Sequence, residues 1–508
     1  MILDSLQAGD LAGQSFDVCI AGAGSAGITL ARALSAKGKR VILLEAGGFE
    51  ISPVSQEFFT GENVGLDYYD PFVSRLRYFG GASNHWGGRC RPLDARDFEV
   101  RPYLPLSGWP IAKTDLDPYA AAADAVLDIA PVATVPEGLI TDDPDLMRIG
   151  YRYSPVNFNT RYRDGIVADP NILLVLNANL VDLVLDDTRR HVTGAVVRGY
   201  DPAAKSLMIS ARRFCLCLGG LENARFLLNA DSQVKGGIAN ARDLVGRYFC
   251  EHPHFFVADV LFENPGALHV NFGLSPEAVA GSRLPNFSTR LMSPVRSLPR
   301  EAARSLVCTS DFEVELVRAV LGRRPNCDHG GLGNWWETRD ADASTAPLQI
   351  NSEQVLDPTS RVRPVQGRDP FGYRQLAIDW RFALQDFATM REAVEMVGRH
   401  LARARIGRLR LRDWLRDGDP VPPGPGSEMP GGYHHMCTTR MSDDPETGAV
   451  DRNCRVHGIG NLYLGGSSIF ATPGHANPTY TIVQLALRLA DHLAAGPQLA
   501  QTEAGDRI

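Results

Sequence analysis

The hydrophobic and polar residues near the start of the chain follow one compact pattern. An apolar run over Phe16–Ala21 predicts a buried strand, and a glycine-rich turn follows it directly. The apolar residues of Ile28–Ala36 recur at helical spacing, Gly38 ends that helix, and Arg40–Leu44 predicts a second strand. The segment therefore predicts a strand, a turn, a helix and a strand, closed by the acidic residue Glu45.

The turn has the G-x-G-x-x-G spacing at Gly22, Gly24 and Gly27. The first glycine allows a tight turn, the second lets the backbone approach a pyrophosphate, and the third lets helix and strand pack closely. The helix N-terminus offers N–H groups and a positive dipole end to phosphates, and Glu45 can accept ribose hydroxyls. The unit predicts dinucleotide binding, and both NAD and FAD fit it.

Two later regions also predict strands. Leu173–Leu185 and Gly194–Arg198 predict a pair of strands, and Arg213–Leu218 predicts a buried strand. Residues 254–430 carry most of the prolines and the least recognisable sequence, as expected of a part that shapes a substrate pocket.

Composition narrows the class of protein. Hydrophobic residues make up 44% of the 508 residues and charged residues 22%, which is typical of a globular protein and not of a membrane or disordered one. The net charge of −7 provides no basic surface for nucleic acid. Nine cysteines without zinc spacing, and a start without an apolar leader, predict a reduced cytoplasmic protein with no metal site.

A second glycine-rich loop runs over Gly80–Arg89. Four glycines flank the pair His85 and Trp86, which indicates backbone lying against a flat or charged group such as an isoalloxazine and its pyrophosphate. With this loop, the chain resembles the glucose-methanol-choline (GMC) flavoprotein oxidoreductases. The other similar segments are the opening unit, Leu218–Arg225, Gly246–Pro253, His434–Met441, Asn461–Ser468 and Ala476–Val483.

The resemblance implies an α/β fold with FAD as cofactor. A Rossmann-like FAD-binding domain of the GMC type would carry an inserted α+β substrate domain containing an antiparallel sheet. The expected order is 1–90, first FAD-binding segment; 91–165, FAD-covering and substrate-side segment; 166–253, second FAD-binding segment; 254–430, substrate-binding domain; and 431–508, C-terminal FAD-binding segment with the catalytic residues.

The resemblance also assigns residues to the cofactor. The expected FAD-binding positions are Gly22, Gly24, Ser25, Ala26, Gly27, Glu45, Ala46, Gly81, Ser83, Asn84, His85, Gly87, Gly88, Gly219, Gly466, Ser467, Ala476, Pro478 and Thr479. Ser83–Trp86 is similar to the loop of the pyranose oxidases, whose histidine is covalently attached to FAD, although Asn84 departs from their pattern. A covalent bond at His85 stays open, and release of all the yellow colour on acid denaturation would exclude it.

The catalytic residues also follow from the resemblance. Oxidising an alcohol requires a base for the hydroxyl proton and a polar partner for the oxygen. The family pattern assigns the base to His434, with Cys437 at the position of the usual glycine, and the partner to Asn477. A register shift by one residue would make His435 the base.

Other readings of the polar residues stay open. Asn477 could be only the N-cap of the following helix, with Pro478 at its first position. His475 could contact substrate or flavin, or simply be solvated. The remaining loop histidines near the FAD segments are expected to have hydrogen-bonded structural roles; they are His252, His254 and His457.

The expected function is oxidation of an alcohol to a carbonyl by hydride transfer to FAD. The closest similarity, to pyranose oxidase and glycoside oxidase-type members, favours a secondary hydroxyl of a sugar, glycoside or polyol. The electron acceptor is oxygen or a quinone-like carrier. Two alternatives are a GMC dehydrogenase that tailors a specialised metabolite and a flavin-dependent lyase or decarboxylase on the same fold.

Overall fold

The computed structural model describes most of the chain. The described residues are 2–3, 11, 14–129, 138–139, 143–201, 203, 205–263, 270–291, 345–416, 420–425 and 432–495. They form two hydrophobic cores, one around a parallel sheet and one around an antiparallel sheet.

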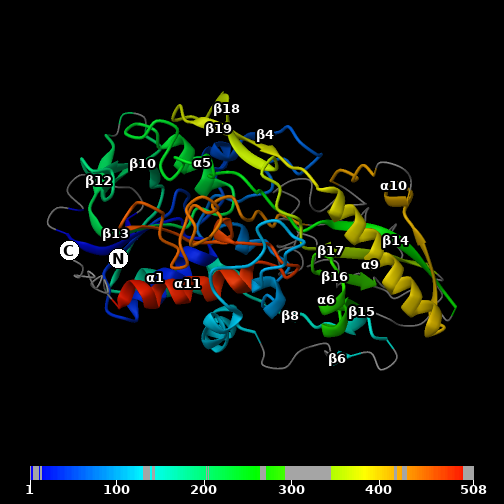
Figure 1. The fold of residues 1–508 in the computed structure, drawn as a ribbon. Coiled ribbons are helices and arrows are strands. Elements are labelled where there is room, and N and C mark those ends of the chain that lie inside the picture. Colours follow the sequence, from blue (N-terminus) through cyan, green and yellow to red (C-terminus); the bar gives the residue numbers. More distant parts are fainter. Residues whose placement is uncertain are drawn as a thin grey trace, which may run out of the picture.

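The first core surrounds a six-stranded sheet in which every neighbouring pair of strands is parallel. In spatial order, its strands are β1 (Ile2–Leu3), β9 (Ile172–Val175), β3 (Val41–Leu44), β2 (Phe16–Ala21), β13 (Ala211–Leu216) and β21 (Leu462–Leu464). Strands β3 and β9 are buried along their whole length, as expected of a parallel sheet covered on both faces. Helices α1 (Ser25–Ser35) and α11 (Thr479–Ala494) lie side by side, so both ends of the chain build this half (Figure 1).

The opening unit agrees closely with the prediction. The first strand has the predicted bounds, the second is one residue shorter, and the helix begins three residues earlier, at Ser25. The predicted strand over Leu173–Leu185 is in fact two strands: β9 joins the parallel sheet, and β10 (Asn179–Leu185) pairs with β11 (Val192–Arg198) in an antiparallel ladder. Asn177, in the left-handed region with φ of 51°, turns the chain between them.

The second core lies against a seven-stranded sheet in which all neighbouring strands are antiparallel. Its strands in spatial order are β20 (Gly407–Leu411), β14 (His254–Phe262), β17 (Thr345–Ser352), β16 (Phe287–Leu291), β15 (Val270–Leu274), β7 (Leu146–Arg148) and β6 (Gly138–Leu139). The long helix α9 (Leu384–Arg403) covers this sheet (Figure 1). Strands β6 and β7 come from outside 254–430, and the exact domain boundaries stay a prediction.

Smaller elements complete the two halves. The remaining strands are β4 (Gly61–Asn63), β5 (Arg89–Cys90), β8 (Arg152–Tyr153), β12 (Leu207–Ile209), β18 (Arg361–Arg368) and β19 (Arg374–Asp379). The remaining α-helices are α2 (Pro53–Gln56), α3 (Ala120–Leu127), α4 (Phe158–Ala168), α5 (Glu222–Asn229), α6 (Pro276–Gly281) and α10 (Asp413–Arg416). Short 3₁₀ turns are η1 (Glu57–Phe59), η2 (Gly81–Asn84), η3 (Ala95–Phe98), η4 (Lys113–Asp115), η5 (Asp117–Tyr119) and η6 (Ser467–Ile469).

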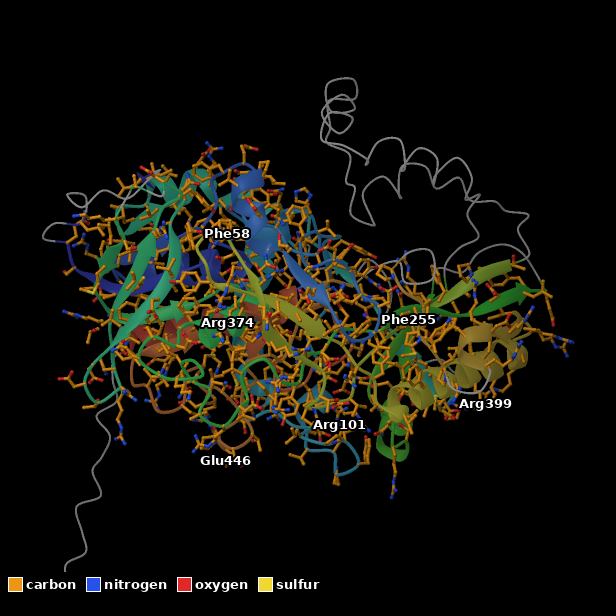
Figure 2. The ribbon with its side chains drawn as sticks, turned by 90° about the horizontal axis from the view of Figure 1, so that it is seen from above. Phe58, Arg101, Phe255, Arg374, Arg399 and Glu446 are labelled. Atoms are coloured by element: carbon orange, nitrogen blue, oxygen red, sulfur yellow. The ribbon has the colours of Figure 1, made fainter. Side chains whose placement is uncertain are left out.

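A buried ion pair ties the two halves together. Arg101 donates from Nη1 and Nη2 to the two carboxylate oxygens of Glu353, both at 2.6 Å, and each side chain is 4% exposed. Figure 2 shows Arg101 at the middle of the molecule, between the half with the parallel sheet and the half that contains Phe255. Removing either partner would leave a buried charge uncompensated, so loss of Arg101 or of Glu353 alone is expected to destabilise the contact between the halves.

Candidate active site

A cavity of about 1190 Å³ lies where the carboxyl ends of the parallel strands meet the antiparallel sheet. This volume exceeds the roughly 300–1,000 Å³ of a site for one small ligand, so it has room for a dinucleotide and a substrate together. The predicted site residues that line it are Gly22, Gly24, Ser25, Ala26, Glu45, Ala46, Gly81, Ser83, His85, Gly87, Gly88, Gly219, His434, Gly466, Ser467, Asn477, Pro478 and Thr479. Three predicted residues, Gly27, Asn84 and Ala476, are not part of this lining.

The glycines of the first turn differ in what requires them. A Cβ at Gly22 would lie 2.5 Å from the carbonyl oxygen of Cys217, and one at Gly27 would lie 1.9 Å from that of Gly22. Both positions are therefore fixed by the protein's own packing. A Cβ at Gly24 would meet no described atom within 4 Å, and its backbone is extended, so no contact of the chain itself requires glycine there.

The Glu45 side chain accepts hydrogen bonds from the backbone on both sides of it and so stabilises the glycine-rich turn. Its carboxylate is buried and accepts the N–H groups of Ala23 at 2.9 Å and Gly47 at 2.8 Å, one on each oxygen. Burial raises the pKa of Glu45, and these backbone hydrogen bonds oppose that shift. Because a carboxylate has about four acceptor positions, each oxygen retains capacity for a further donor such as a ribose hydroxyl.

The second glycine-rich loop also faces the cavity. Gly80 and Gly81 have φ of 90° and 56°, and η2 begins at Gly81. The side chain of Asn84 donates to the carbonyl of Phe79 at 2.8 Å and accepts the N–H of Asn159 at 2.8 Å, so it holds the loop rather than lining the cavity. His85 lies at the cavity wall, next to the glycines that follow it.

His434 lies on a backbone segment with two residues in left-handed conformations. Tyr433 has φ of 60° and Cys437 has φ of 68°, a region that favours glycine. This conformation gives a physical reason for the glycine that usually occupies the position of Cys437. The segment presents the His434 ring to the cavity with its side chain 16% exposed.

The structure brings His434 and Asn477 together. Nδ2 of Asn477 lies 3.4 Å from Nε2 of His434, and Oδ1 of Asn477 has no hydrogen-bond partner among the described residues. Helix α11 begins at Thr479 with Pro478 at its N-cap position, and no described side chain caps it. The alternative in which Asn477 acts only as a helix cap is therefore wrong.

His435 has a different environment. Its ring is buried between Tyr68 and Phe249, with ring centroids at 5.9 and 6.0 Å. Burial lowers the pKa of His435 to about 3, with the nearby Arg75 contributing. It is the neighbouring histidine, His434, that lies beside Asn477.

A family comparison gives this geometry its context. A sequence model of the GMC oxidoreductase family matches residues 357–486. Over this C-terminal segment the chain is similar to the GMC oxidoreductases. Together with the similar proteins described next, this match confirms the predicted α/β fold with an antiparallel substrate sheet, the class of flavoprotein oxidoreductase that acts on CH–OH donors, and FAD as the cofactor.

Individual GMC relatives are distant in sequence. The chain is 25% identical to the fructose dehydrogenase large subunit of Gluconobacter japonicus over 315 residues, 60% of this chain and about half (51%) of that relative. It is 21% identical to 2-methyl-1,2-propanediol dehydrogenase of Mycolicibacterium austroafricanum over 561 aligned positions, 94% of this chain and 95% of the relative. Among solved structures, pyridoxine 4-oxidase from Mesorbium loti has the same fold, with a TM-score of 0.55, 18% identity, and coverage of 94% and 99%.

The residues that line the cavity fit FAD. No described side chain caps the N-terminus of α1 or of α11, so both helix ends retain N–H groups for a cofactor. The bare backbone at Gly24 and the remaining acceptor capacity of Glu45 complete the fit for a pyrophosphate and a ribose. The individual FAD contacts stay a prediction.

In the described parts of the chain, no helix is both long and apolar enough to cross a lipid bilayer.

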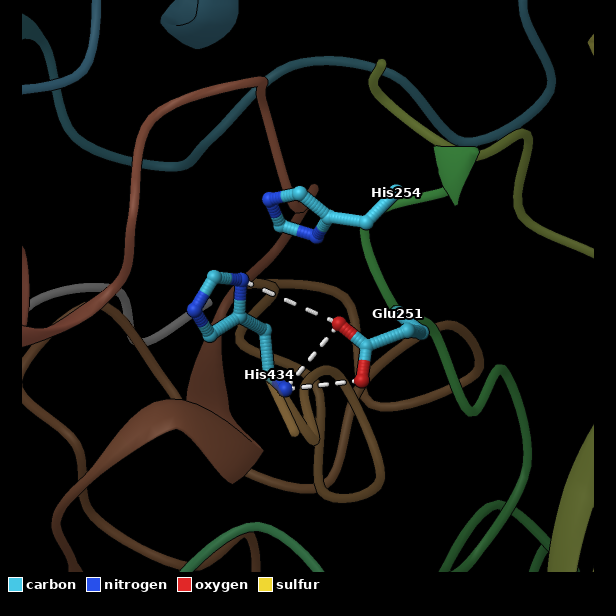
Figure 3. A group of neighbouring side chains, drawn as sticks. All are labelled: Glu251, His254 and His434. Atoms are coloured by element: carbon cyan, nitrogen blue, oxygen red, sulfur yellow. Dashed lines mark hydrogen bonds and ion pairs between the residues drawn. The ribbon is translucent and has the colours of Figure 1, made fainter. Parts of the chain in front are cut away.

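A buried acid and two histidines adjoin His434. Figure 3 shows Glu251 and His254 facing the His434 ring, and their potential ligand atoms all lie within 4.8 Å of one another. The Glu251 carboxylate, however, already accepts Tyr68 Oη at 2.5 Å, the N–H of His252 at 2.8 Å, and the N–H of His434 at 2.7 and 3.0 Å. Because these contacts occupy its acceptor positions, we assign no metal to the cluster.

These neighbours of His434 were not among the predicted site residues. Burial raises the pKa of Glu251 to about 7 against the opposing effect of its hydrogen bonds. His254 begins β14 rather than lying in a loop, and its ring centroid is 5.2 Å from that of His434. The signal in the sequence was the run Glu251, His252 and His254 directly before a predicted substrate segment.

His475 is buried and paired, so the alternative of a solvated loop histidine is wrong. Its Nε2 lies 2.9 Å from a carboxylate oxygen of Asp94. Burial alone lowers the pKa of His475, but the hydrogen bond to Asp94 outweighs it and raises the pKa to about 9. His475 is therefore a cation at neutral pH.

This pair predicts a pH-dependent stability. A histidine whose folded-state pKa is raised stabilises the fold fully below its unfolded value of about 6.5 and loses that contribution as the pH rises through about 9. We expect His475→Gln to lower the free energy of unfolding by about 1–3 kcal/mol at pH 6 and by much less at pH 10. This range allows for solvent screening of the ion pair, because Asp94 is partly exposed. Urea unfolding of both proteins from pH 6 to 10 measures this; a constant difference would contradict it.

Proposed function

We propose that this protein oxidises a secondary hydroxyl of a sugar, glycoside or polyol to a carbonyl, with His434 as the base and Asn477 as its partner. The observation that carries the proposal is the pair of side chains 3.4 Å apart in the cavity, next to the glycine-rich turns. Bound FAD supplies the acceptor for the hydride that leaves the carbinol carbon.

His434 has the properties of a base for this proton transfer. Burial lowers its pKa well below the usual 6.5, and the neighbouring histidines and Arg89 lower it further, so the ring is neutral at physiological pH. A neutral imidazole has one nitrogen lone pair, which accepts the hydroxyl proton as the carbon–oxygen double bond forms. The Asn477 amide orients the oxygen that loses this proton.

The substrate side of the cavity supports a polyhydroxylated ligand. Gln349 on β17 lies opposite both Phe256 on β14 and Arg290 on β16, and all three line the cavity. Directly opposed residues share one face of a sheet, so an aromatic ring, an amide and a guanidinium form one row. Such a row offers an apolar platform and several donors to hydroxyl groups.

The names of two relatives support a substrate that carries more than one hydroxyl group, although 2-methyl-1,2-propanediol has a primary and a tertiary hydroxyl and no secondary one. The two curated relatives are named for fructose and for 2-methyl-1,2-propanediol, and each of these compounds carries more than one hydroxyl group. Both relatives are named dehydrogenases, whereas the structural neighbour is named an oxidase. We therefore keep oxygen and a quinone-like carrier as acceptors to be separated by experiment.

An anaerobic reduction experiment tests the proposal. The purified holoprotein is mixed without oxygen with sugars, glycosides, polyols and simple alcohols, while the visible absorbance of the flavin is recorded. Bleaching by a sugar, glycoside or polyol supports the proposal, and readmission of air or of a quinone then identifies the acceptor. Bleaching only by simple alcohols would reject a sugar, glycoside or polyol as the substrate. No bleaching by any compound would favour a specialised-metabolite substrate or a lyase.

A further inference from the structure

The side chain of His252 lies between the His434 ring and the backbone carbonyl of Pro473. Nδ1 of His252 is 2.9 Å from Nδ1 of His434, and Nε2 of His252 is 3.2 Å from the carbonyl oxygen of Pro473. The His252 side chain is buried. Because His252 contacts an acceptor on one side and the proposed base on the other, the three groups form a chain whose hydrogen positions can be deduced.

The contact with the Pro473 carbonyl determines which nitrogen of His252 carries the hydrogen. A carbonyl oxygen only accepts hydrogen bonds, so Nε2 of His252 must carry the proton that is shared with it. Burial lowers the pKa of His252 to about 4, so the ring is neutral and has a single N–H group. Nδ1 of His252 therefore carries a lone pair, and it can only accept in its contact with His434.

The second hydrogen follows from the first. At 2.9 Å, the contact between the two Nδ1 atoms is a hydrogen bond, so Nδ1 of His434 must be the donor. The other acceptor near this atom, a carboxylate oxygen of Glu251, is 3.8 Å away and too distant for a hydrogen bond. Because His434 is also neutral, its lone pair must be on Nε2, the atom that faces Asn477.

We infer that His252 is a positioning residue that selects the tautomer of His434 in which Nε2 is the free base. The inference rests on the proposed function, in which Nε2 accepts the hydroxyl proton. In the other tautomer Nε2 carries a hydrogen, and the ring has no lone pair toward the cavity. The fold fixes the active form through a backbone carbonyl, because the Pro473 contact leaves His252 no alternative proton arrangement.

The same chain determines where the proton rests after transfer. Nε2 of His434 forms a new N–H bond, and its Nδ1–H remains directed at His252. His252 cannot donate back, because its only hydrogen lies on the Pro473 side. The positive charge therefore forms on His434, where a carboxylate oxygen of Glu251 is 3.8 Å from Nδ1.

Two nearly isosteric variants of the holoenzyme test the inference. His252→Asn can keep an acceptor oxygen where Nδ1 stands, whereas His252→Leu removes every acceptor. We expect the leucine variant to lower kcat about 10- to 100-fold with KM changed little, and the asparagine variant to restore most of the loss. Flavin content and near-UV circular dichroism show whether each variant retains the fold and cofactor.

A spectroscopic measurement reads the tautomer directly and does not depend on turnover. In protein labelled with ¹⁵N-histidine, the inference expects His434 to carry its hydrogen on Nδ1, with assignment by comparison with His434→Gln. The leucine variant should show a mixture of tautomers or the Nε2–H form. An Nε2–H form in the wild-type protein overturns the inference even if the leucine variant fails to fold.

The pH profile separates a proton-transfer role from a purely structural one. Besides His252, the titratable and charged groups that face His434 are Glu251, His254, His435 and Arg89. All of these remain in both variants, so a change in the acid limb of kcat/KM that appears with leucine and not with asparagine follows from His252. Unchanged kcat, profile and tautomer in the leucine variant would reject the inference, while the proposed function would still stand on the loss seen on replacing His434.

Discussion

Replacing His434 with alanine is expected to lower kcat by about 10²–10⁴-fold while the protein stays yellow. Under the proposed function the imidazole takes the hydroxyl proton beside Asn477, and an alanine side chain offers no base at that position. FAD should be retained, because the glycine-rich turns and Glu45 lie on other segments of the cavity wall. Steady-state turnover with the substrate found in the reduction experiment, together with flavin content, measures both effects.

The adjacent histidine provides the matched control. His435→Ala removes the same kind of side chain one position along, from a packed site between Tyr68 and Phe249. We expect this change to lower the melting temperature and to affect kcat far less than His434→Ala. A larger loss of kcat from His435→Ala than from His434→Ala would show that His435 is the base. The role inferred for His252, which contacts His434, would then no longer apply.

The lowered pKa of His434 also predicts the pH dependence of the wild-type enzyme. A base acts in its neutral form, so a pKa well below 6.5 keeps His434 active throughout the neutral range. The acid limb of kcat/KM should therefore lie below pH 6.5 and disappear in His434→Ala.

What could be predicted from the sequence was local. The conformation of the turn between β2 and α1 depends on contacts within a few residues, such as the approach of Gly27 to the carbonyl of Gly22. The spacing of the glycines in the sequence was therefore enough to predict this turn. His434 and Asn477 were predicted from short motifs, and their 3.4 Å separation agrees with their assignment as a pair.

What could not be predicted depends on packing between distant segments. His252 is 182 residues from His434 along the chain, and no periodicity or spacing indicates that their rings meet. The pairing of His475 with Asp94 spans 381 residues, so a loop position alone could not show that the ring is buried and charged. The break in Leu173–Leu185 depends on the left-handed Asn177, because the apolar pattern continues across it.

Gly24→Val is expected to prevent FAD binding without disturbing the fold. A Cβ at this position meets no described atom of the chain within 4 Å, and the backbone is in an extended conformation that valine adopts readily. The expected conflict is with a pyrophosphate lying against the turn, because the added methyl groups occupy the space into which it must come. The affinity for FAD should fall on the order of 100-fold or more.

A matched substitution and a stability measurement make this test specific. Gly165→Val places the same side chain on the exposed face of α4, outside the cavity lining, and should leave FAD binding unchanged. Because a bound ligand stabilises only the folded state that binds it, Gly24→Val should unfold at the temperature of wild-type protein stripped of FAD. Undiminished affinity in a folded Gly24→Val protein would show that the pyrophosphate does not approach this turn, whereas unfolding below the stripped wild type would show that Gly24 is needed by the fold itself.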